Sequence, residues 1–279
     1  MEGGMKLVVK KHDATNTQVR EKAKSEIQTI LKARHKNVIM LLGSSTAESF
    51  LFTVYEYACN GSLDKYLSKE SSRPLIWKER KRVVIGLARG LKYLHDNNIV
   101  HCNIKPSNIL LTHDFNPLIG DYNFGREQEL KSYKNKNRED YEYVAPEFQE
   151  KGKLSSKADV YSFGVVILEL IAGRRTTDFT SEHKSLVEWA KPLLKKKNYS
   201  ELVDPIIRNS YEEDHLRWMV QVITECLEKN PKKRSSMNMV VSALQGIADS
   251  ELDHMTDDIT PAVSDSRSVP EINGSQGNK

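Results

Sequence analysis

The sequence predicts an α+β protein in which a small, strand-rich N-terminal part precedes a larger and mainly helical part. Three short stretches have the apolar composition of strands: Lys6 to Lys10, residues 37–43 and Phe50 to Tyr57. The stretch from Trp77 to His95 carries apolar residues at helical spacing, and the stretch from Val19 to Ala33 is also amphipathic. We expect the first strand to be short and buried, and the long helix to supply core residues.

Composition indicates a soluble, globular protein. The 279 residues are enough for one or two domains, and 38% are hydrophobic against 29% charged. The net charge of +4 comes from dispersed basic residues, which does not favour nucleic-acid binding. Three widely spaced cysteines indicate a reducing compartment. The longest apolar run, residues 160–172, is interrupted by Glu169 and too short to span a bilayer, and the first residues lack a signal-peptide pattern. We therefore expect no membrane span and a cytosolic or nuclear location.

One polar stretch, from His101 to Asp121, contains residues suited to phosphate chemistry. Asn108 and Asp121 offer an amide oxygen and a carboxylate, which are hard ligands of the kind that Mg²⁺ takes together with phosphate oxygens. Lys105 adds a positive charge where a transferring phosphoryl group would gather negative charge. Asn103 has the shape of an aspartate, but its amide cannot take up a proton at neutral pH.

The stretch His101-Cys102-Asn103-Ile104-Lys105-Pro106-Ser107-Asn108 resembles the catalytic loop of protein kinases, H-R-D-x-K-x-x-N. Asp121-Tyr122-Asn123 resembles the metal-binding D-F-G motif, and both spacings match the kinase pattern. The resemblance places Asn103 where kinases have their general base, a group typically worth about 10²–10⁴-fold in rate. It gives His101 a supporting role in the loop.

The resemblance extends to the N-terminal part. Lys10 matches the strand lysine of V-A-I-K, which grips the nucleotide phosphates, and Glu26 matches its glutamate partner on the next helix. Tyr55 matches the residue before the hinge, where adenine would bond to the backbone of Glu56 and Ala58. Only nine residues precede Lys10, so we expect the first two strands and the Gly-rich phosphate loop to be absent from this sequence.

Further matches lie in the helical part. Asp159 matches the residue that holds the catalytic-loop backbone, and Arg234 matches the arginine that pairs with the glutamate of A-P-E, here Glu147. Between these motifs the sequence departs from the family. Asn123 replaces the Gly of D-F-G, and Asp140 replaces a Thr that normally contacts the catalytic residues.

The resemblance implies a two-lobed α+β kinase fold, with a truncated small lobe at residues 1–57, a helical large lobe at 58–249 and a disordered tail at 250–279. The sequences around Tyr55, Gly61 and Asp159 are most similar to plant receptor-like kinases and their Pelle and interleukin-receptor-associated relatives.

Two functions are compatible with these residues. The first is a pseudokinase, an impaired kinase-like domain that serves as a scaffold or allosteric partner for an active kinase, a receptor or a substrate protein. The alternative is a weakly active Ser/Thr kinase, in which a loose transition state needs little from a base. ATP and Mg²⁺ are the implied cofactors, bound by Lys10, Glu26, Asn108 and Asp121 and weakened by the missing phosphate loop.

Overall fold

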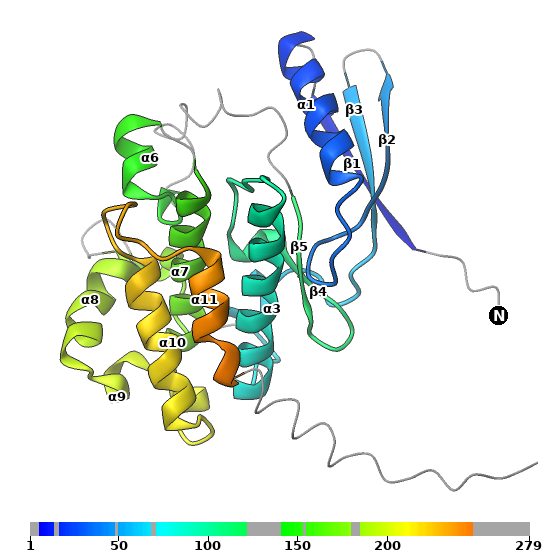
Figure 1. Ribbon diagram of the computed structural model, residues 1–279. Coiled ribbons are helices and arrows are strands. Elements are labelled where there is room, and N and C mark those ends of the chain that lie inside the picture. The colour runs from blue at the N-terminus through cyan, green and yellow to red at the C-terminus, as the bar shows by residue number, and fades with distance from the viewer. Residues whose placement is uncertain are drawn as a thin grey trace, which may run out of the picture.

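The computed structural model describes residues 6–13, 17–47, 50–67, 71–121, 141–152, 155–179 and 185–247. A small antiparallel sheet with one helix beside it stands next to a larger body of helices (Figure 1). This is the predicted α+β class.

Among the described residues the sheet contains three strands in the order β1-β3-β2, formed by β1 (Leu7–Asp13), β2 (Leu41–Ala47) and β3 (Phe50–Glu56). Helix α1 (Thr17–Ile30) buries Ala23, Ile27 and Ile30 and leaves its other face exposed. In β3, odd-numbered residues are buried and even-numbered residues only half-buried, because successive side chains of a strand point to opposite faces. The register pairs Lys10 with Thr53, which places Lys10 on the inner, helix-covered side.

Two strand predictions need correction. The strand predicted at residues 37–43 begins only at Leu41 and runs to Ala47, because residues 37–39 bond to a hairpin of the helical part instead. The first strand is at the predicted place but is not buried: Leu7 and Val9 are 44% and 62% exposed. It is one of the two edge strands of the described sheet, and Leu7 and Val9 lie on the face opposite to Val8 and Lys10.

The larger body is built mainly from helices. In chain order its elements are α2 (Asp64–Leu67), α3 (Trp77–Asp96), η1 (Pro106–Asn108), β4 (Ile109–Leu111), β5 (Pro117–Ile119), α6 (Pro146–Lys151), α7 (Ser156–Ala172), η3 (Thr176–Asp178), α8 (Leu186–Lys196), α9 (Tyr199–Leu202), η4 (Pro205–Ile207), α10 (Glu213–Cys226) and α11 (Met237–Ala243). The predicted long helix is thus confirmed as α3.

Helix α7 is the centre of this body. Every residue from Ala158 to Ala172 is buried, and the helix packs against α3 and α10 (Figure 1). Close packing requires glycine at Gly164, where an added Cβ would lie 2.7 Å from the Cβ of Cys226. Since α7 is mostly apolar and buried on every side, it is a core helix. Within the described residues, the structure contains no helix long and apolar enough to cross a bilayer.

The two parts are joined through the β4–β5 hairpin. Asn37 is buried, its carbonyl accepts from the Ile119 amide at 3.0 Å, and its side chain donates to the Pro117 carbonyl at 3.0 Å. Asn37 therefore ties the segment after α1 to the hairpin that precedes Asp121. The boundary expected between residues 57 and 58 stays a prediction, and the tail expected from residue 250 lies outside the described residues.

Candidate functional site

A buried carboxylate of α7 fixes the backbone of the polar loop. Asp159 is 1% exposed and accepts hydrogen bonds from the amides of His101 and Cys102, both at 2.8 Å. His95, in the last turn of α3, contacts the same carboxylate at 2.9 Å. Cys102 is half-exposed and has a φ of +64°, a region that a residue with a Cβ enters at a cost. The hydrogen bonds from the His101 and Cys102 amides to the Asp159 carboxylate hold the chain in this conformation.

His101 links the loop to the segment that carries Asp121. Its Nε2 lies 2.9 Å from the Gly120 carbonyl, and its Nδ1 accepts from the Asn103 amide at 3.2 Å. These contacts require a neutral ring protonated on Nε2. Burial lowers the pKa of His101, which favours that neutral form. The His101 ring therefore holds the loop at Asn103 and the segment at Gly120 in a fixed position relative to each other.

Asn103 and Asn108 are held against each other. Asn108, at the end of η1, donates from its side-chain nitrogen to the Asn103 carbonyl at 2.8 Å, and its own carbonyl accepts from the Gly120 amide at 2.9 Å. The bond to Asn103 uses the side-chain nitrogen of Asn108, so the side-chain oxygen is the atom of this residue with the chemistry to ligate a metal. Lys105 is half-buried immediately before η1. The loop thus keeps a fixed backbone around Asn103.

Lys10 of strand β1 places its ammonium group beside the segment that follows β5. Lys10 Nζ lies 2.8 Å from Asp121 Oδ1, although the two residues are 111 positions apart. Asp121 has a φ of +58°, a left-handed conformation that a residue with a Cβ enters at a cost. Glu26 is half-buried on α1, and its pairing with Lys10 stays a prediction. The structure therefore brings together Lys10, Asn103, Asn108 and Asp121, while Asn123 and Asp140 lie outside the described residues.

The predicted adenine-binding residues lie at the C-terminal end of β3 and just after it. Tyr55 is 2% exposed, and burial raises the pKa of its hydroxyl to about 12. Glu56 ends the strand and is fixed twice by Met40, since its carboxylate accepts from the Met40 amide at 2.7 Å and its amide donates to the Met40 carbonyl at 3.2 Å. Ala58 is buried at the start of the turn that contains Gly61, whose φ is +68°. Adenine recognition by this segment stays a prediction.

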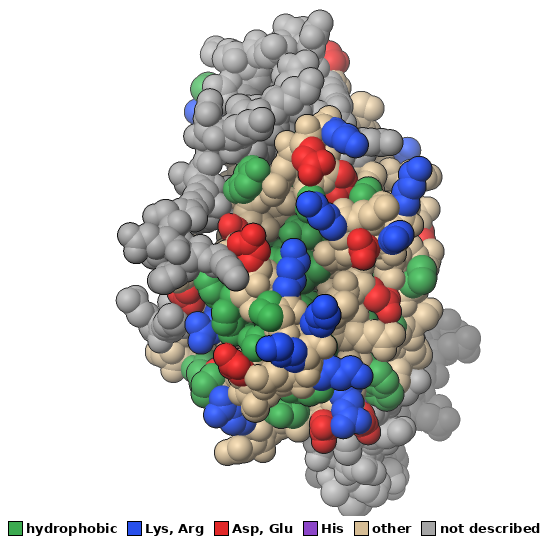
Figure 2. Space-filling model, turned by 90° about the vertical axis from the view of Figure 1, so that its left-hand side faces the viewer, with side chains coloured by type: hydrophobic (Ala, Val, Ile, Leu, Met, Phe, Trp, Pro, Cys, Tyr) green, Lys and Arg blue, Asp and Glu red, His purple; other side chains and the backbone are tan. Residues whose placement is uncertain are grey.

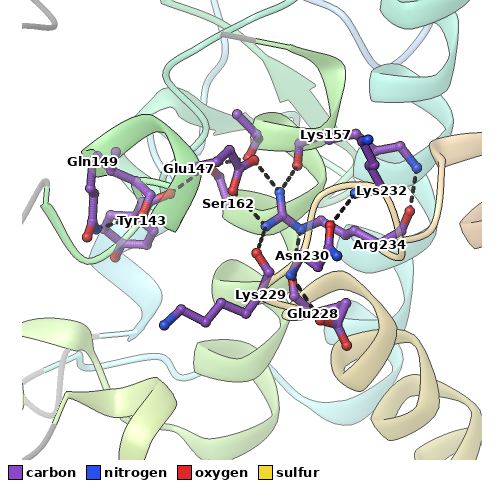
Figure 3. Close-up of polar contacts among 12 residues, drawn as sticks. Tyr143, Glu147, Gln149, Lys157, Ser162, Glu228, Lys229, Asn230, Lys232 and Arg234 are labelled. Carbon is purple, nitrogen blue, oxygen red and sulfur yellow. Dashed lines mark hydrogen bonds and ion pairs between the residues drawn. The ribbon is translucent and has the colours of Figure 1, made fainter. Parts of the chain in front are cut away.

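A buried ion pair braces the segment after residue 140. Arg234 is 1% exposed and grips both carboxylate oxygens of Glu147, at 2.7 and 2.9 Å (Figure 3). The same guanidinium donates to the carbonyls of Lys157 and Glu228, at 2.6 and 2.9 Å. All of its charge is therefore matched by oxygens of α6, α7 and the turn after α10.

A second buried carboxylate anchors Tyr143, just before α6. Glu169 is fully buried in α7 and accepts from the Tyr143 hydroxyl at 2.9 Å and from the Thr176 amide at 2.8 Å. Ser162 donates to the Tyr143 carbonyl at 2.7 Å, so Tyr143 is held both at its backbone and at its hydroxyl. Burial raises the pKa of Glu169 to about 7, because the charged form loses its hydration.

His95 and Glu169 were not identified as site residues from the sequence, although a signal existed for both. His95 continues the buried stripe of α3 that contains Leu87 and Leu91, and Glu169 is the one acidic residue within the apolar run 160–172. A polar side chain on a buried stripe needs a partner inside the protein. Their partners, Asp159 and Tyr143, could not be identified by spacing alone.

Metal binding would depend on few protein groups. Within the described residues, no three His, Cys, Asp or Glu side chains gather closely enough to hold a metal ion. Asp121 and Asn108 provide one carboxylate and one amide oxygen. That donor set suits Mg²⁺, which keeps several waters and takes phosphate oxygens as its remaining ligands.

Comparison with known proteins decides the family. The model of the protein kinase domain family matches residues 2–244. The chain belongs to the protein kinase family. This kinase domain is 35% identical over 254 residues to the proline-rich receptor-like protein kinase PERK8 of Arabidopsis thaliana, covering 86% of this chain and 37% of that protein. It is 33% identical over 274 residues to PERK7 of the same plant, covering 94% of this chain and 39% of that protein.

A third relative belongs to a different receptor-like group. The kinase domain is 35% identical over 255 residues to an Arabidopsis thaliana protein named as a leucine-rich repeat receptor-like serine/threonine-protein kinase. That match covers 88% of this chain and 25% of the relative. The chain thus spans between a quarter and two fifths of the length of these curated relatives.

Proposed function

We propose that this kinase domain is catalytically impaired and acts as a pseudokinase, a signalling scaffold or allosteric partner of other proteins. One observation carries the proposal: residue 103 is Asn where the kinase loop has its general base. An amide nitrogen and oxygen cannot accept the proton of an attacking hydroxyl at neutral pH. Loss of a general base lowers a rate by about 10²–10⁴-fold.

The preserved contacts around the loop support a scaffold role. Asp159 still holds the backbone of the loop, and Arg234 still pairs with Glu147. These contacts stabilise the fold and do not themselves transfer protons. The replacements Asn123 and Asp140 point in the same direction, since both lie at positions that matter for catalysis in the family. A domain used only for binding needs Asp159, Arg234 and Glu147, which stabilise the fold. It does not need the family's catalytic residues at positions 123 and 140.

ATP and Mg²⁺ fit the remaining groups. Lys10 would contact the phosphates, and Asp121 with the Asn108 amide oxygen would hold the metal, which when bound neutralises phosphate charge. Lys10 and Asp121 are 2.8 Å apart, so phosphate competes with Asp121 for the ammonium and Mg²⁺ competes with Lys10 for the carboxylate. We therefore expect nucleotide and Mg²⁺ to bind only by breaking this ion pair, which lowers their affinity.

The second candidate is a weakly active Ser/Thr kinase. The observation that favours it is the same close approach of Lys10 and Asp121, the cation expected to bind phosphate and the carboxylate expected to bind the metal. Phosphoryl transfer relies mostly on positioning and charge stabilisation. In this reading, positioned ATP and Mg²⁺ support slow transfer without a base at residue 103.

Thermal unfolding and phosphotransfer assays together separate the two candidates. ATP and Mg²⁺ at 100 times the dissociation constant should stabilise the fold by about 2.7 kcal/mol. We expect a shift of the unfolding midpoint that requires Mg²⁺ and is abolished in Lys10→Met, with no phosphate transferred to a protein acceptor. Transfer by the unmodified chain that is lost in Lys10→Met would establish the second candidate instead.

Partners and location complete the proposal. An active kinase, a receptor or a substrate protein is the class of partner that a scaffold of this family would bind. A cytosolic or nuclear location stays a prediction.

A further inference from the structure

Five exposed basic side chains gather around the end of α8. They are Lys191, Lys195, Lys196, Lys197 and Arg208, and we call them the lysine face. Among the described residues none of the five forms an ion pair, and the Arg208 guanidinium donates to the Ser200 carbonyl at 3.0 Å. Figure 2 shows Lys and Arg side chains gathered on the lower half of this side of the molecule, with fewer Asp and Glu among them.

Helix termination accounts for only part of this cluster. Lys195 and Lys196 are in the last turn of α8, where cations interact favourably with the helix dipole. Lys191 lies a turn earlier, and Arg208 follows η4 outside the helix. The nearby acid Glu188 is engaged in the cap of α8, where it accepts from the Ser185 amide at 3.2 Å. Glu201, an exposed acid of α9, accepts from the Asn198 side chain at 2.9 Å. The lysine face keeps a net positive charge, because its five cations outnumber these two acids.

The same chain contains a segment of opposite charge. Residues 249–258 include five acidic side chains and no Lys or Arg: Asp249, Glu251, Asp253, Asp257 and Asp258. This acidic segment begins two positions after Ile247, the last described residue. Eleven residues, 248–258, can span at most about 36–40 Å when extended.

The described part of the chain ends at the same end of the molecule as α9 (Figure 1). Gly246 lies against the Trp218 ring, since a Cβ added there would be 2.9 Å from it, and Trp218 is in the first half of α10, ten positions after Arg208. The end of α11 and α9 lie at the same end of the molecule (Figure 1). Three other exposed lysines, Lys229, Lys232 and Lys233, are in the turn before α11, at the opposite end of that helix.

We propose that the acidic segment, residues 249–258, binds across the lysine face of the same molecule. Each exposed ion pair contributes little alone, but a tethered segment acts at a high effective concentration and makes several pairs at once. The contact should weaken as salt screens it. While it is formed, the acidic segment excludes acidic peptides of other proteins from α8.

The test uses the full chain and nuclear magnetic resonance of backbone amides. The first variant replaces Lys191, Lys195, Lys196 and Lys197 by Gln, and the matched control replaces Lys229, Lys232 and Lys233 by Gln. A third protein carries Asn or Gln at the five acidic positions. We expect the amide signals of residues 249–258 to move in the first variant and not in the control, and the α8 signals to move in the third protein. About 0.5 M NaCl should produce the same changes in the unmodified chain.

Several outcomes would overturn the proposal. Signals of residues 249–258 that are identical in the first variant and the unmodified chain would show that the lysine face does not bind the segment. Equal shifts in the first variant and the control would show non-specific attraction. Shifts that grow with protein concentration would assign the lysine face to the acidic segment of a second copy. Signals of α8 that respond only to phosphatidylserine vesicles would assign it to a membrane surface.

Discussion

Replacing Glu147 by Gln should strongly destabilise the fold, because the Arg234 guanidinium would stay buried after losing its counter-charge. Arg234 has a side chain that is 0% exposed, and the Glu147 carboxylate supplies two of its contacts, at 2.7 and 2.9 Å. Removing one partner of a buried pair costs about 3–5 kcal/mol. We expect the lower end of this range, since the carbonyls of Lys157 and Glu228 still accept from the guanidinium.

Thermal unfolding followed by circular dichroism would measure this loss. For a protein of this size each kcal/mol lowers the midpoint by about 2–4 °C, so Glu147→Gln should lower it by roughly 6–12 °C. The matched control is Glu213→Gln, which removes the exposed partner of Arg217 and should leave the midpoint unchanged. Adding Arg234→Met to Glu147→Gln should restore part of the stability, because it removes the stranded charge. A midpoint for Glu147→Gln within the error of the control would refute the reasoning.

Three further perturbations have defined outcomes. The pKa of Glu169 is raised from 4.5 to about 7, so the folded protein binds the proton of this carboxyl group more tightly than the unfolded chain does. The stability that this proton contributes is lost as pH rises from about 4.5 through 7. Urea unfolding at several pH values should show that Glu169→Gln removes a slope worth up to about 3 kcal/mol, and an unchanged slope would contradict the assignment. Gly90→Ala would place a Cβ 2.7 Å from the Asn37 carbonyl oxygen and should lower the free energy of unfolding by about 1–3 kcal/mol, measured by thermal unfolding. Gly43→Ala meets no atom within 4 Å and serves as the control. Equal midpoints for the two variants would disprove the clash. Asp159→Asn should speed hydrogen exchange at the amides of His101 and Cys102, which it holds at 2.8 Å, and unaltered exchange would show that the loop does not depend on this carboxylate.

Periodicity predicted the elements whose burial follows from their own sequence. The helix expected from Trp77 to His95 forms as α3 from Trp77 to Asp96, and the strand expected at Phe50 forms as β3. The strand expected at residues 37–43 was misplaced, because Asn37 bonds to the Pro117 and Ile119 backbone and this long-range contact decides where β2 begins. The exposure of β1 likewise depends on which strand lies beside it, which no local pattern reports.

The candidate site was predictable in its residue types and less so in its contacts. The order and spacing of Asn103, Asn108 and Asp121 identified the loop, since those residues are close in the chain. The approach of Lys10 to Asp121 and the bond of His95 to Asp159 join distant segments, so only the folded structure gives them. The positive φ of Cys102 is imposed by the Asp159 carboxylate, and a non-glycine sequence carries no sign of it.

The most direct test of the central claim is the rate of phosphate transfer to a protein acceptor by Asn103→Asp, compared with the unmodified chain at the same saturating ATP and Mg²⁺. Asp has the shape of Asn. The backbone of residue 103 donates to His101 Nδ1 and accepts from the Asn108 side chain, and these bonds hold either residue in place. If residue 103 is the site of the defect, the restored base should raise the rate by about 10²–10⁴-fold. An unmodified chain that already transfers phosphate at the rate of Asn103→Asp would contradict the claim that this domain has lost its chemistry at Asn103.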